Sequence, residues 1–334
     1  MANRDIVAIG TSAGGVEALL FLARQFPPRF PAAILVTLHL PSHARSTLDV
    51  ILSQAGPLPA GFGANGAALK KGRIFIAPPG RHLLVEGDRL SLGSGPIENN
   101  VRPAIDPMLR SAAVCCGPRA IGVVLTGTMG DGAAGLAALS QCGGLTVVQD
   151  PRDAAFPEMP LTALNRSPPD HVVRLADIPA LLESLVHQPA GEPMPVPETI
   201  KFEVDIARGE RASMSDMDRI GRRSVLACPD CNGVMWEIDE NDLLRYRCHV
   251  GHAYSAEMMS LALDENLRRA LGSALRALDE RVALAEKLRK QASERGQNQL
   301  TDTWARKKED YEGEAEVIRS AIKRADDIAA KAAA

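Results

Sequence analysis

The chain has 334 residues, with 38 basic and 41 acidic side chains, a formal net charge of −3, a hydrophobic fraction of 46% and an aromatic content of 4%. This composition allows a large core and two or three domains, and it excludes a strongly basic nucleic-acid binder and a chain disordered by charge. No apolar run reaches membrane-spanning length and no signal peptide is recognisable, so we expect a cytoplasmic protein without membrane insertion, whose six cysteines are thiols or metal ligands.

Residues 1–188 are expected to form one domain in which short apolar runs alternate with helical patterns. Such runs suit strands buried on both faces, and the alternation predicts an α/β fold with a doubly wound, mainly parallel sheet. The expected strands are Ile6–Ile9, Ala33–Leu40, Ile74–Ala77, Ile121–Leu125, Leu145–Val148 and Val172–Leu175. The expected helices are Gly15–Gln25, Ala44–Gln54, Ile105–Cys116, Gly132–Gln141 and Ile178–His187. His82–Leu92 reads as a local hairpin on this domain.

Two shorter segments follow the α/β domain. Residues 189–221 are expected to be a Pro-rich linker, because 189–200 hold four prolines and show no periodicity. Residues 222–256 are expected to be a small zinc-ribbon-like module. Its two strands are predicted at Val234–Ile238 and Leu243–Cys248.

The last segment, 257–334, is rich in Ala, Leu, Glu, Lys and Arg. Apolar side chains recur at alternating spacings of four and three from Leu271 to Ala285, and a second such series runs from Trp304 to Ala325. This spacing predicts an α-helical hairpin or coiled-coil tail that turns at 295–298. Self-association, docking of a signalling partner and a lid over another domain all remain open for this tail.

The first strand ends in a turn with a chemical signature. Gly10-Thr11-Ser12-Ala13-Gly14 fits the pattern Gly-x-Ser-x-Gly. In such a strand-to-helix turn, the serine oxygen lies at a helix N-terminus, where backbone amides favour a developing negative charge. A phosphate-binding turn and a simple helix cap at Ser12 are the other interpretations.

A nucleophilic serine needs a base, and the base needs an orienting group. His39 follows the second expected strand, and Asp131 follows a later one. Because the carboxyl ends of strands in an open α/β sheet form ligand sites, these residues are expected to meet Ser12. Taken alone, His39 fits a core histidine and Asp131 a helix N-cap. His43, near the same edge, is a further candidate for substrate contact.

Longer motifs make the N-terminal domain resemble one family. The residues from Ile6 to Leu19 resemble the opening of the catalytic domain of CheB, the chemotaxis protein-glutamate methylesterase. The similarity continues, in order and spacing, through His39-Leu40-Pro41, Ile76-Ala77-Pro78-Pro79-Gly80-Arg81-His82, Val101-Arg102-Pro103-Ala104-Ile105-Asp106, Leu125-Thr126-Gly127-Thr128-Met129-Gly130-Asp131-Gly132-Ala133-Ala134-Gly135 and Gln149 to Pro160. It covers about residues 4–188.

The resemblance implies a Ser-His-Asp triad at Ser12, His39 and Asp131. It implies hydrolysis of glutamyl methyl esters, and deamidation of glutamines, on a methylated chemoreceptor or similar signalling protein, with no cofactor for catalysis. The expected oxyanion donors are amides of Ala13 and Gly14 and of Thr128 and Met129. Arg102 is a candidate for contact with an acidic receptor surface, or a surface arginine that pairs locally.

The sequence also departs from the family pattern. We expect a stand-alone catalytic domain without a receiver domain. The loop before Asp131 reads Thr128-Met129-Gly130, where the family has Met-Gly-Asn.

The cysteine module carries a metal-ligand spacing. Cys228 and Cys231 form a Cys-x-x-Cys knuckle, and Cys248 with His252 follows a predicted hairpin. This set predicts a structural zinc, with His252 preferred over His249 because it is far enough from Cys248 to fold back. A redox Cys-x-x-Cys is the alternative. Cys115, Cys116 and Cys142 are expected to be core thiols.

Three other functions compete with the methylesterase. One is a non-catalytic signalling scaffold, and another is a carboxylesterase of different specificity. The third is a nucleic-acid-binding zinc ribbon fused to a hydrolase-like domain, against which the acidic balance and the scarcity of aromatics argue. The complete set of Ser12, His39 and Asp131 favours the enzyme, and we expect no nucleic-acid partner.

Overall fold

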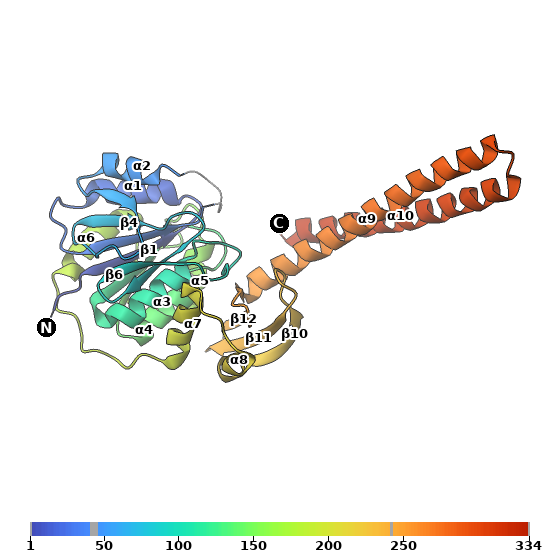
Figure 1. Ribbon diagram of the computed structural model, residues 1–334. Helices are drawn as coiled ribbons and strands as arrows, with labels where there is room; N and C mark the ends of the chain where they lie inside the picture. Colours follow the sequence, from blue (N-terminus) through green and yellow to red (C-terminus); the bar gives the residue numbers. More distant parts are fainter. Residues whose placement is uncertain (1, 41–45, 241–242, 333–334) are drawn as a thin grey trace. The chain divides into compact units, whose positions relative to one another are not determined.

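The computed structural model describes residues 2–40, 46–240 and 243–332. The chain divides into two compact units, Met1–Met259 and Ser260–Ala334. The first unit holds a seven-stranded sheet with helices and a four-stranded antiparallel sheet, and the second holds two long helices (Figure 1). No helix in the described ranges combines the length and apolar character that crossing a membrane requires.

The large sheet is entirely parallel and runs in the order β3-β4-β2-β1-β7-β8-β9. Its strands are β1 (Ile6–Thr11), β2 (Ala33–Leu38), β3 (Ala60–Phe62), β4 (Arg73–Ile76), β7 (Ala120–Val124), β8 (Leu145–Gln149) and β9 (His171–Val173). The α/β prediction is therefore confirmed. The short edge strand β3 was not expected, because its three residues are only half-buried and carry no apolar run.

Helices cover both faces of this sheet (Figure 1). One layer is α1 (Gly15–Gln25), α2 (Leu48–Ala55) and α6 (Ile178–Val186), and the other is α3 (Ile105–Cys116), α4 (Ala133–Gln141) and α5 (Glu158–Arg166). Side chains of β1 alternate between the two cores: Val7 and Ile9 pack toward the α1 layer, and Ile6 and Ala8 toward the α3 layer. The predicted hairpin is present as β5 (His82–Glu86) and β6 (Arg89–Gly93).

The prediction of a linker over 189–221 needs correction. Its first residues are irregular, but α7 (Glu198–Arg208) and α8 (Met214–Ile220) follow. Helix α7 buries Ile200, Val204 and Ala207 on a face that contacts α3 and the β5–β6 hairpin. Helix α8 begins with a capping box between Ser213 and Asp216. Apolar burial and capping thus override the preceding prolines.

The cysteine module is a four-stranded antiparallel sheet in the order β10-β11-β12-β13. Its strands are β10 (Arg222–Ala227), β11 (Val234–Glu240), β12 (Leu243–Cys248) and β13 (Ala253–Ser255). Trp236 of β11 is fully buried against Met217 of α8 and Ile206 of α7. The helices expected to be linker therefore supply part of the module's core.

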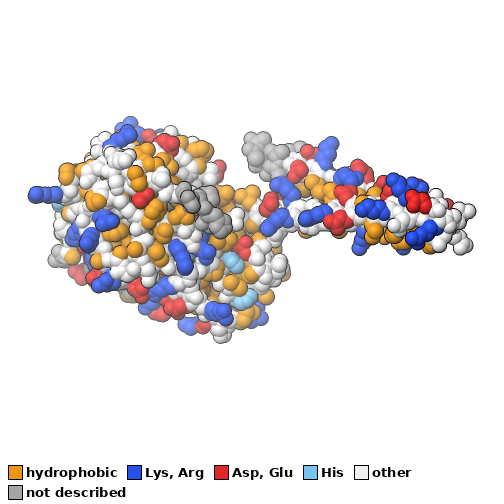
Figure 2. Space-filling view, turned by 45° about the horizontal axis from the view of Figure 1, so that its top comes forward, with side chains coloured by type: hydrophobic (Ala, Val, Ile, Leu, Met, Phe, Trp, Pro, Cys, Tyr) orange, Lys and Arg blue, Asp and Glu red, His pale blue; other side chains and the backbone are white. Residues whose placement is uncertain are grey.

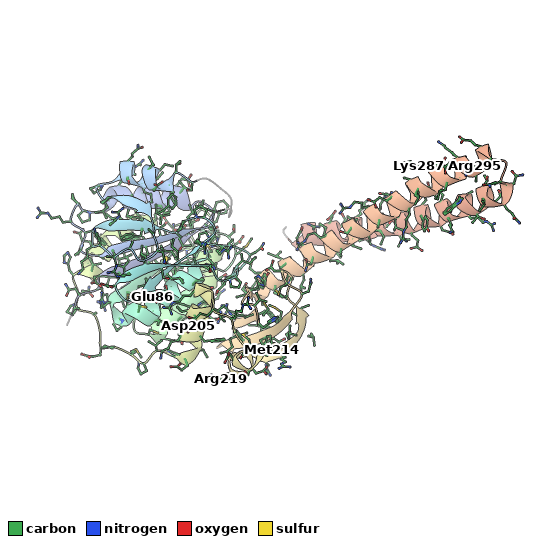
Figure 3. All side chains as sticks on the ribbon, viewed as in Figure 1. Glu86, Asp205, Met214, Arg219, Lys287 and Arg295 are labelled. Atoms are coloured by element: carbon green, nitrogen blue, oxygen red, sulfur yellow. The ribbon has the colours of Figure 1, made fainter. Side chains whose placement is uncertain are left out.

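The second unit is the predicted helical hairpin. Helix α9 (Ala256–Glu294) begins in the first unit, and α10 (Asn298–Ala332) returns antiparallel to it. Ala285, Ala292 and Ala315 are buried between them, and the pairs Arg319–Asp279 (2.8 Å) and Arg268–Asp326 (3.1 Å) link the two helices. The outer surface mixes positive and negative side chains, and Lys287 and Arg295 project near the turn (Figures 2 and 3).

Candidate active site

Three adjacent strands bring Ser12, His39 and Asp131 to one edge of the sheet. Strand β1 lies between β2 and β7, and the three residues follow the carboxyl ends of these strands. The chain leaves β1 toward β2 and later returns to pair β7 on the other side. This is the point where an open α/β sheet binds its ligands.

The side chains form a continuous hydrogen-bonded series. His39 Nδ1 lies 3.1 Å from Ser12 Oγ, and His39 Nε2 lies 2.7 Å from Asp131 Oδ2. Because Asp131 is an acceptor, Nε2 carries the proton and Nδ1 is left to accept from the Ser12 hydroxyl. The imidazole is therefore oriented as a general base toward the serine.

Several hydrogen-bond donors hold the side chain of Asp131 in place. It is 1% exposed, and its carboxylate accepts hydrogen bonds from the amides of Ile105 (2.6 Å) and Asp106 (3.1 Å) and from Asn99 Nδ2 (3.1 Å). Burial opposes its ionisation, but the hydrogen bond and charge of His39, with these amides, lower the pKa of Asp131 to about 2. Asp131 is thus a fixed anion that orients His39.

A second carboxyl group lies next to Asp131. Asp106 accepts hydrogen bonds from the amides of Gly132 (3.0 Å) and Gly135 (2.6 Å) at the start of α4. Burial, together with the charge of Asp131, raises the pKa of Asp106 to about 7. The two neighbouring carboxyl groups therefore divide into one ionised group and one that readily holds a proton.

The turn that carries Ser12 is fastened to the loop after β7. The Ser12 amide donates to Thr126 O (3.1 Å), and Thr126 Oγ1 donates to Ala13 O (3.0 Å). Gly14, the N-cap of α1, has φ of 73°, a left-handed conformation that favours glycine. A Cβ on Gly127 would overlap Met159 and crowd Ser12. Small residues thus let the two loops meet around Ser12.

The predicted oxyanion and substrate residues differ in where they lie relative to this turn and in which groups they already bind. Ala13 and Gly14 directly follow Ser12, and Thr128 and Met129 lie in the loop before Asp131. The Met129 amide donates to Glu158 Oε2 at 2.8 Å, so it already faces a carboxylate oxygen. Arg102 donates to the backbone carbonyl of Gly95 at 2.7 Å, as its local-pairing interpretation anticipated. His43 lies outside the described residues.

The cysteine module gathers a second group of reactive side chains. One ligand atom from each of Cys228, Cys231, Cys248 and His252 lies within 4.8 Å of the others. The Cys231–Cys248 sulfur separation is 3.7 Å, close to the edge of about 3.7 Å in a tetrahedron with metal–sulfur bonds of about 2.3 Å. The donor set and its spacing fit a metal ion. Among the described residues, His249 is not part of this cluster.

Sequence reasoning missed Asn99, Asp106 and Glu158. Asp106 lies inside a motif that pointed to the family, but its spacing from Asp131 gave no sign that the two carboxyl groups meet. Asn99 precedes that motif and carries no pattern of its own. Glu158 begins a helix that was not expected, because prolines at 157 and 160 obscure its periodicity.

Comparison with known proteins gives one consistent result. A family model described as CheB methylesterase matches residues 7–182. Proteins named protein-glutamate methylesterase/protein-glutamine glutaminase 2 are 36% identical in Anaeromyxobacter dehalogenans (55% of this chain, 54% of that protein) and 35% identical in Koribacter versatilis (53% and 50%). The chain therefore spans about half the length of these relatives.

This chain matches a shorter relative and a solved structure over almost their whole length. A putative protein-glutamate methylesterase/protein-glutamine glutaminase of Leptospira interrogans is 33% identical over 54% of this chain and 93% of its own. The crystal structure of the Thermotoga maritima CheB methylesterase catalytic domain matches with a TM-score of 0.53 and 30% identity. It covers 56% of this chain and 100% of the Thermotoga chain. The range matched by the family model, residues 7–182, falls within the α/β domain.

Proposed function

Because the chain belongs to the CheB methylesterase family, we propose that it is a serine hydrolase that removes methyl esters from glutamyl side chains of a chemoreceptor-like protein. Deamidation of glutaminyl side chains at the same positions is the second reaction of the proposal, as the names of its relatives suggest. The observation that carries the proposal is the hydrogen-bonded series Ser12–His39–Asp131.

The first half of the proposed reaction forms an acyl-enzyme. Ser12 Oγ attacks the ester carbonyl carbon while His39 Nδ1 takes the hydroxyl proton. The tetrahedral intermediate then expels methoxide, which leaves as methanol with the proton from His39. Asp131 stabilises the imidazolium that exists between these two proton transfers.

The second half returns the serine. A water molecule loses a proton to His39 Nδ1 and attacks the acyl carbon, and the Ser12 oxygen leaves with that proton. The product is a glutamate carboxylate. For glutamine, ammonia replaces methanol as the leaving group, and the remaining steps are the same.

Negative charge on the carbonyl oxygen needs nearby donors, and the amides after Ser12 and in the Thr128–Met129 loop are our proposal. The Met129 amide donates to Glu158 in this structure, so Glu158 must move before that amide can serve. Arg102 stays a candidate for receptor contact only if it gives up its bond to Gly95.

The other parts of the chain have proposed roles. We assign a structural zinc to Cys228, Cys231, Cys248 and His252, where it would cross-link the ends of the module's strands. Three of the six cysteines would then be metal ligands, and we propose a cytoplasmic location for the chain. We keep the α/β domain at 1–188, the module at 222–256 and the helical tail at 257–334, and propose that the tail serves self-association or partner binding.

The test is methanol release from a methylated chemoreceptor preparation. We expect release by the wild type and a fall of about 10⁴-fold or more in Ser12→Ala. Ser140→Ala, an exposed serine of α4, is the matched control and is expected to keep full activity.

Two other results would redirect the proposal. Hydrolysis of a small ester without methanol release from any receptor would indicate a carboxylesterase of other specificity. No hydrolysis of either substrate by the folded protein would favour the signalling scaffold.

A further inference from the structure

A tight turn at 98–101 lies between the candidate active site and the cysteine module. Glu98 and Val101 exchange backbone hydrogen bonds (3.2 and 3.0 Å), and Asn99 and Asn100 have φ of 50° and 65°. Two successive left-handed residues define a type I′ turn, which Asn tolerates well. The turn therefore holds the Asn99 side chain in one direction.

Toward the active site, Asn99 binds the two buried carboxyl groups. Its side-chain amide Nδ2 donates to Asp131 Oδ1 at 3.1 Å and to Asp106 Oδ2 at 3.3 Å. Asn99 is 7% exposed, so water is poorly placed to replace these bonds. Asp131 in turn binds and orients His39. Asn99 therefore acts on His39 through Asp131.

Toward the module, the same residue binds strand β13. The Asn99 amide donates to Ala253 O at 2.7 Å, and Asn99 Oδ1 accepts from the Ser255 amide at 3.0 Å. All of the side chain's polar atoms are therefore engaged, with Nδ2 on the active-site side and Oδ1 on the module side. The bond to Ser255 joins residues 156 positions apart in sequence.

Buried ion pairs fix the module against this turn. Glu98, next to Asn99, pairs with Arg110 of α3 and with Arg247 of β12. Glu203 of α7 pairs with Arg245 (3.0 Å) and Arg247 (3.0 Å) of the same strand. These five side chains are all buried, and a buried charge that loses its partner is strongly destabilising. The contact between turn and module is thus a specific one.

The cysteine cluster shapes the strand that Asn99 binds. Cys248 ends β12, His252 directly precedes β13, and the Cys248 amide donates to His252 O at 3.0 Å. Arg247 also donates to Gly251 O at 2.9 Å. Any ion held by Cys248 and His252 would fix the four-residue connection 249–252 that leads into β13, the strand that Asn99 binds.

We propose that Asn99 is a positioning residue for Asp131, and that the Cys/His module holds Asn99 in place and thereby sets the hydrolytic activity of the α/β domain. The inference rests on the proposed function, because it concerns the same triad. It adds a dependence of that site on a module that lies outside residues 7–182, the range that the family model matches.

Two substitutions of Asn99 in the full chain test its proposed positioning role, the first half of the proposal. Asn99→Asp keeps the turn and the Oδ1 acceptor for Ser255 but replaces the donor with an oxygen facing Asp131. Asn99→Gly keeps the turn and removes the side chain. We expect kcat to fall about 10- to 100-fold in both, with KM within about twofold, because Asn99 is buried behind Asp131.

The matched controls are Asn100→Asp and Asn100→Gly, at the neighbouring left-handed and exposed position. Both are expected to keep the wild-type kcat. Equal kcat values for the Asn99 and Asn100 variants would overturn the positioning role, and so would a loss that appears only in KM.

Running each assay on a methylated receptor and on a small activated ester separates the two proposals. A wild type that cleaves only the small ester, in a manner that depends on Ser12, contradicts the proposed substrate. The Asn99 comparison still stands on that ester.

Cys231→Ser tests the second half. We expect hydrogen exchange at the Asn99 amide, which donates to Ala253 O, to speed up, together with a fall in kcat. In the double variant with Asn99→Gly, we expect kcat to fall no further than in Asn99→Gly alone. Unchanged Asn99 exchange in folded Cys231→Ser protein, or a full additional loss of kcat in the double variant, would overturn the dependence on the module.

Discussion

Asp106 and Asp131 share two hydrogen-bond donors, Asn99 Nδ2 and the Gly132 amide, yet their pKa values move in opposite directions. The difference follows from their partners. Both carboxyl groups are buried, but Asp131 faces the imidazole of His39, whereas Asp106 faces the negative charge of Asp131. Within this buried pair, Asp131 stays ionised, whereas Asp106 titrates near neutral pH.

Asp106 should make the stability of the fold depend on pH. Burial and the charge of Asp131 raise its pKa to about 7, above the value of 3.8 expected without them. The folded state therefore binds more protons between those values, and its stability falls as pH rises toward 7. Asp106→Asn has no proton to lose, so urea unfolding between pH 5 and 7 should shift in its favour by at most about 1.4 kcal/mol per pH unit.

The comparison has an internal control. Hydrogen bonds from Arg152 lower the pKa of Asp150 to about 2, so Asp150→Asn should give a constant difference from wild type over the same pH range. A stability difference between Asp106→Asn and wild type that stays flat from pH 5 to 7 would contradict the raised pKa.

At the scale of elements, the site depends on how closely β1 approaches α3. Gly10 pairs with Thr37 and Val124 in the middle of the sheet, and a Cβ there would overlap the side chain of Ile105. The amide of Ile105 holds Asp131 at 2.6 Å. A glycine in a strand therefore sets the position of a helix start that orients the triad.

Gly10→Ala should weaken both the fold and the reaction. We expect a loss of about 1–3 kcal/mol in the free energy of unfolding, because the added methyl displaces Ile105, and a lower kcat, because Asp131 loses its short amide contact. Gly61→Ala in edge strand β3 is the control, since its Cβ would meet only the flexible guanidinium of Arg73 at 3.2 Å. Equal stability and equal kcat in the two variants would contradict this account.

The same element scale shows what was predictable from the sequence. Strands β1, β2 and β7 are buried on both faces and therefore read as apolar runs, which was enough to align Ser12, His39 and Asp131 at one edge. Helices α5 and α7 were not predictable, because prolines hide their starts. Asn99 was not predictable because its role comes from a strand more than 150 residues away. Sequence patterns therefore predict elements that are determined by residues close in sequence, but they do not predict contacts between residues far apart in sequence.

At the scale of the whole molecule, the boundary between Met259 and Ser260 separates the candidate active site and the cysteine cluster from the helical hairpin. The triad, the turn with Asn99 and the cysteine cluster all belong to the first unit. The hairpin buries little beyond a few alanines, and several of its apolar side chains, such as Leu284 and Val317, are more than half exposed. These exposed apolar side chains are the ones that the proposed association would cover.

A chain that ends at Met259 should therefore keep the zinc site that we propose and its kcat on a small ester. We expect the hairpin to matter only for a protein substrate or for oligomeric state, which light scattering and the receptor assay would measure. A small-ester kcat that falls with the hairpin removed would show that the second unit contributes to the reacting site.

The bond between Asn99 and Ser255 also orders events during synthesis. The ribosome makes Ser12, His39 and Asp131 long before it makes β13, so a nascent chain carries all three groups while the partner strand of Asn99 does not yet exist. A product that terminates early, or is cut before residue 253, would carry a triad that is complete in composition but unsupported. Full activity would then require that the whole first unit has been translated and folded.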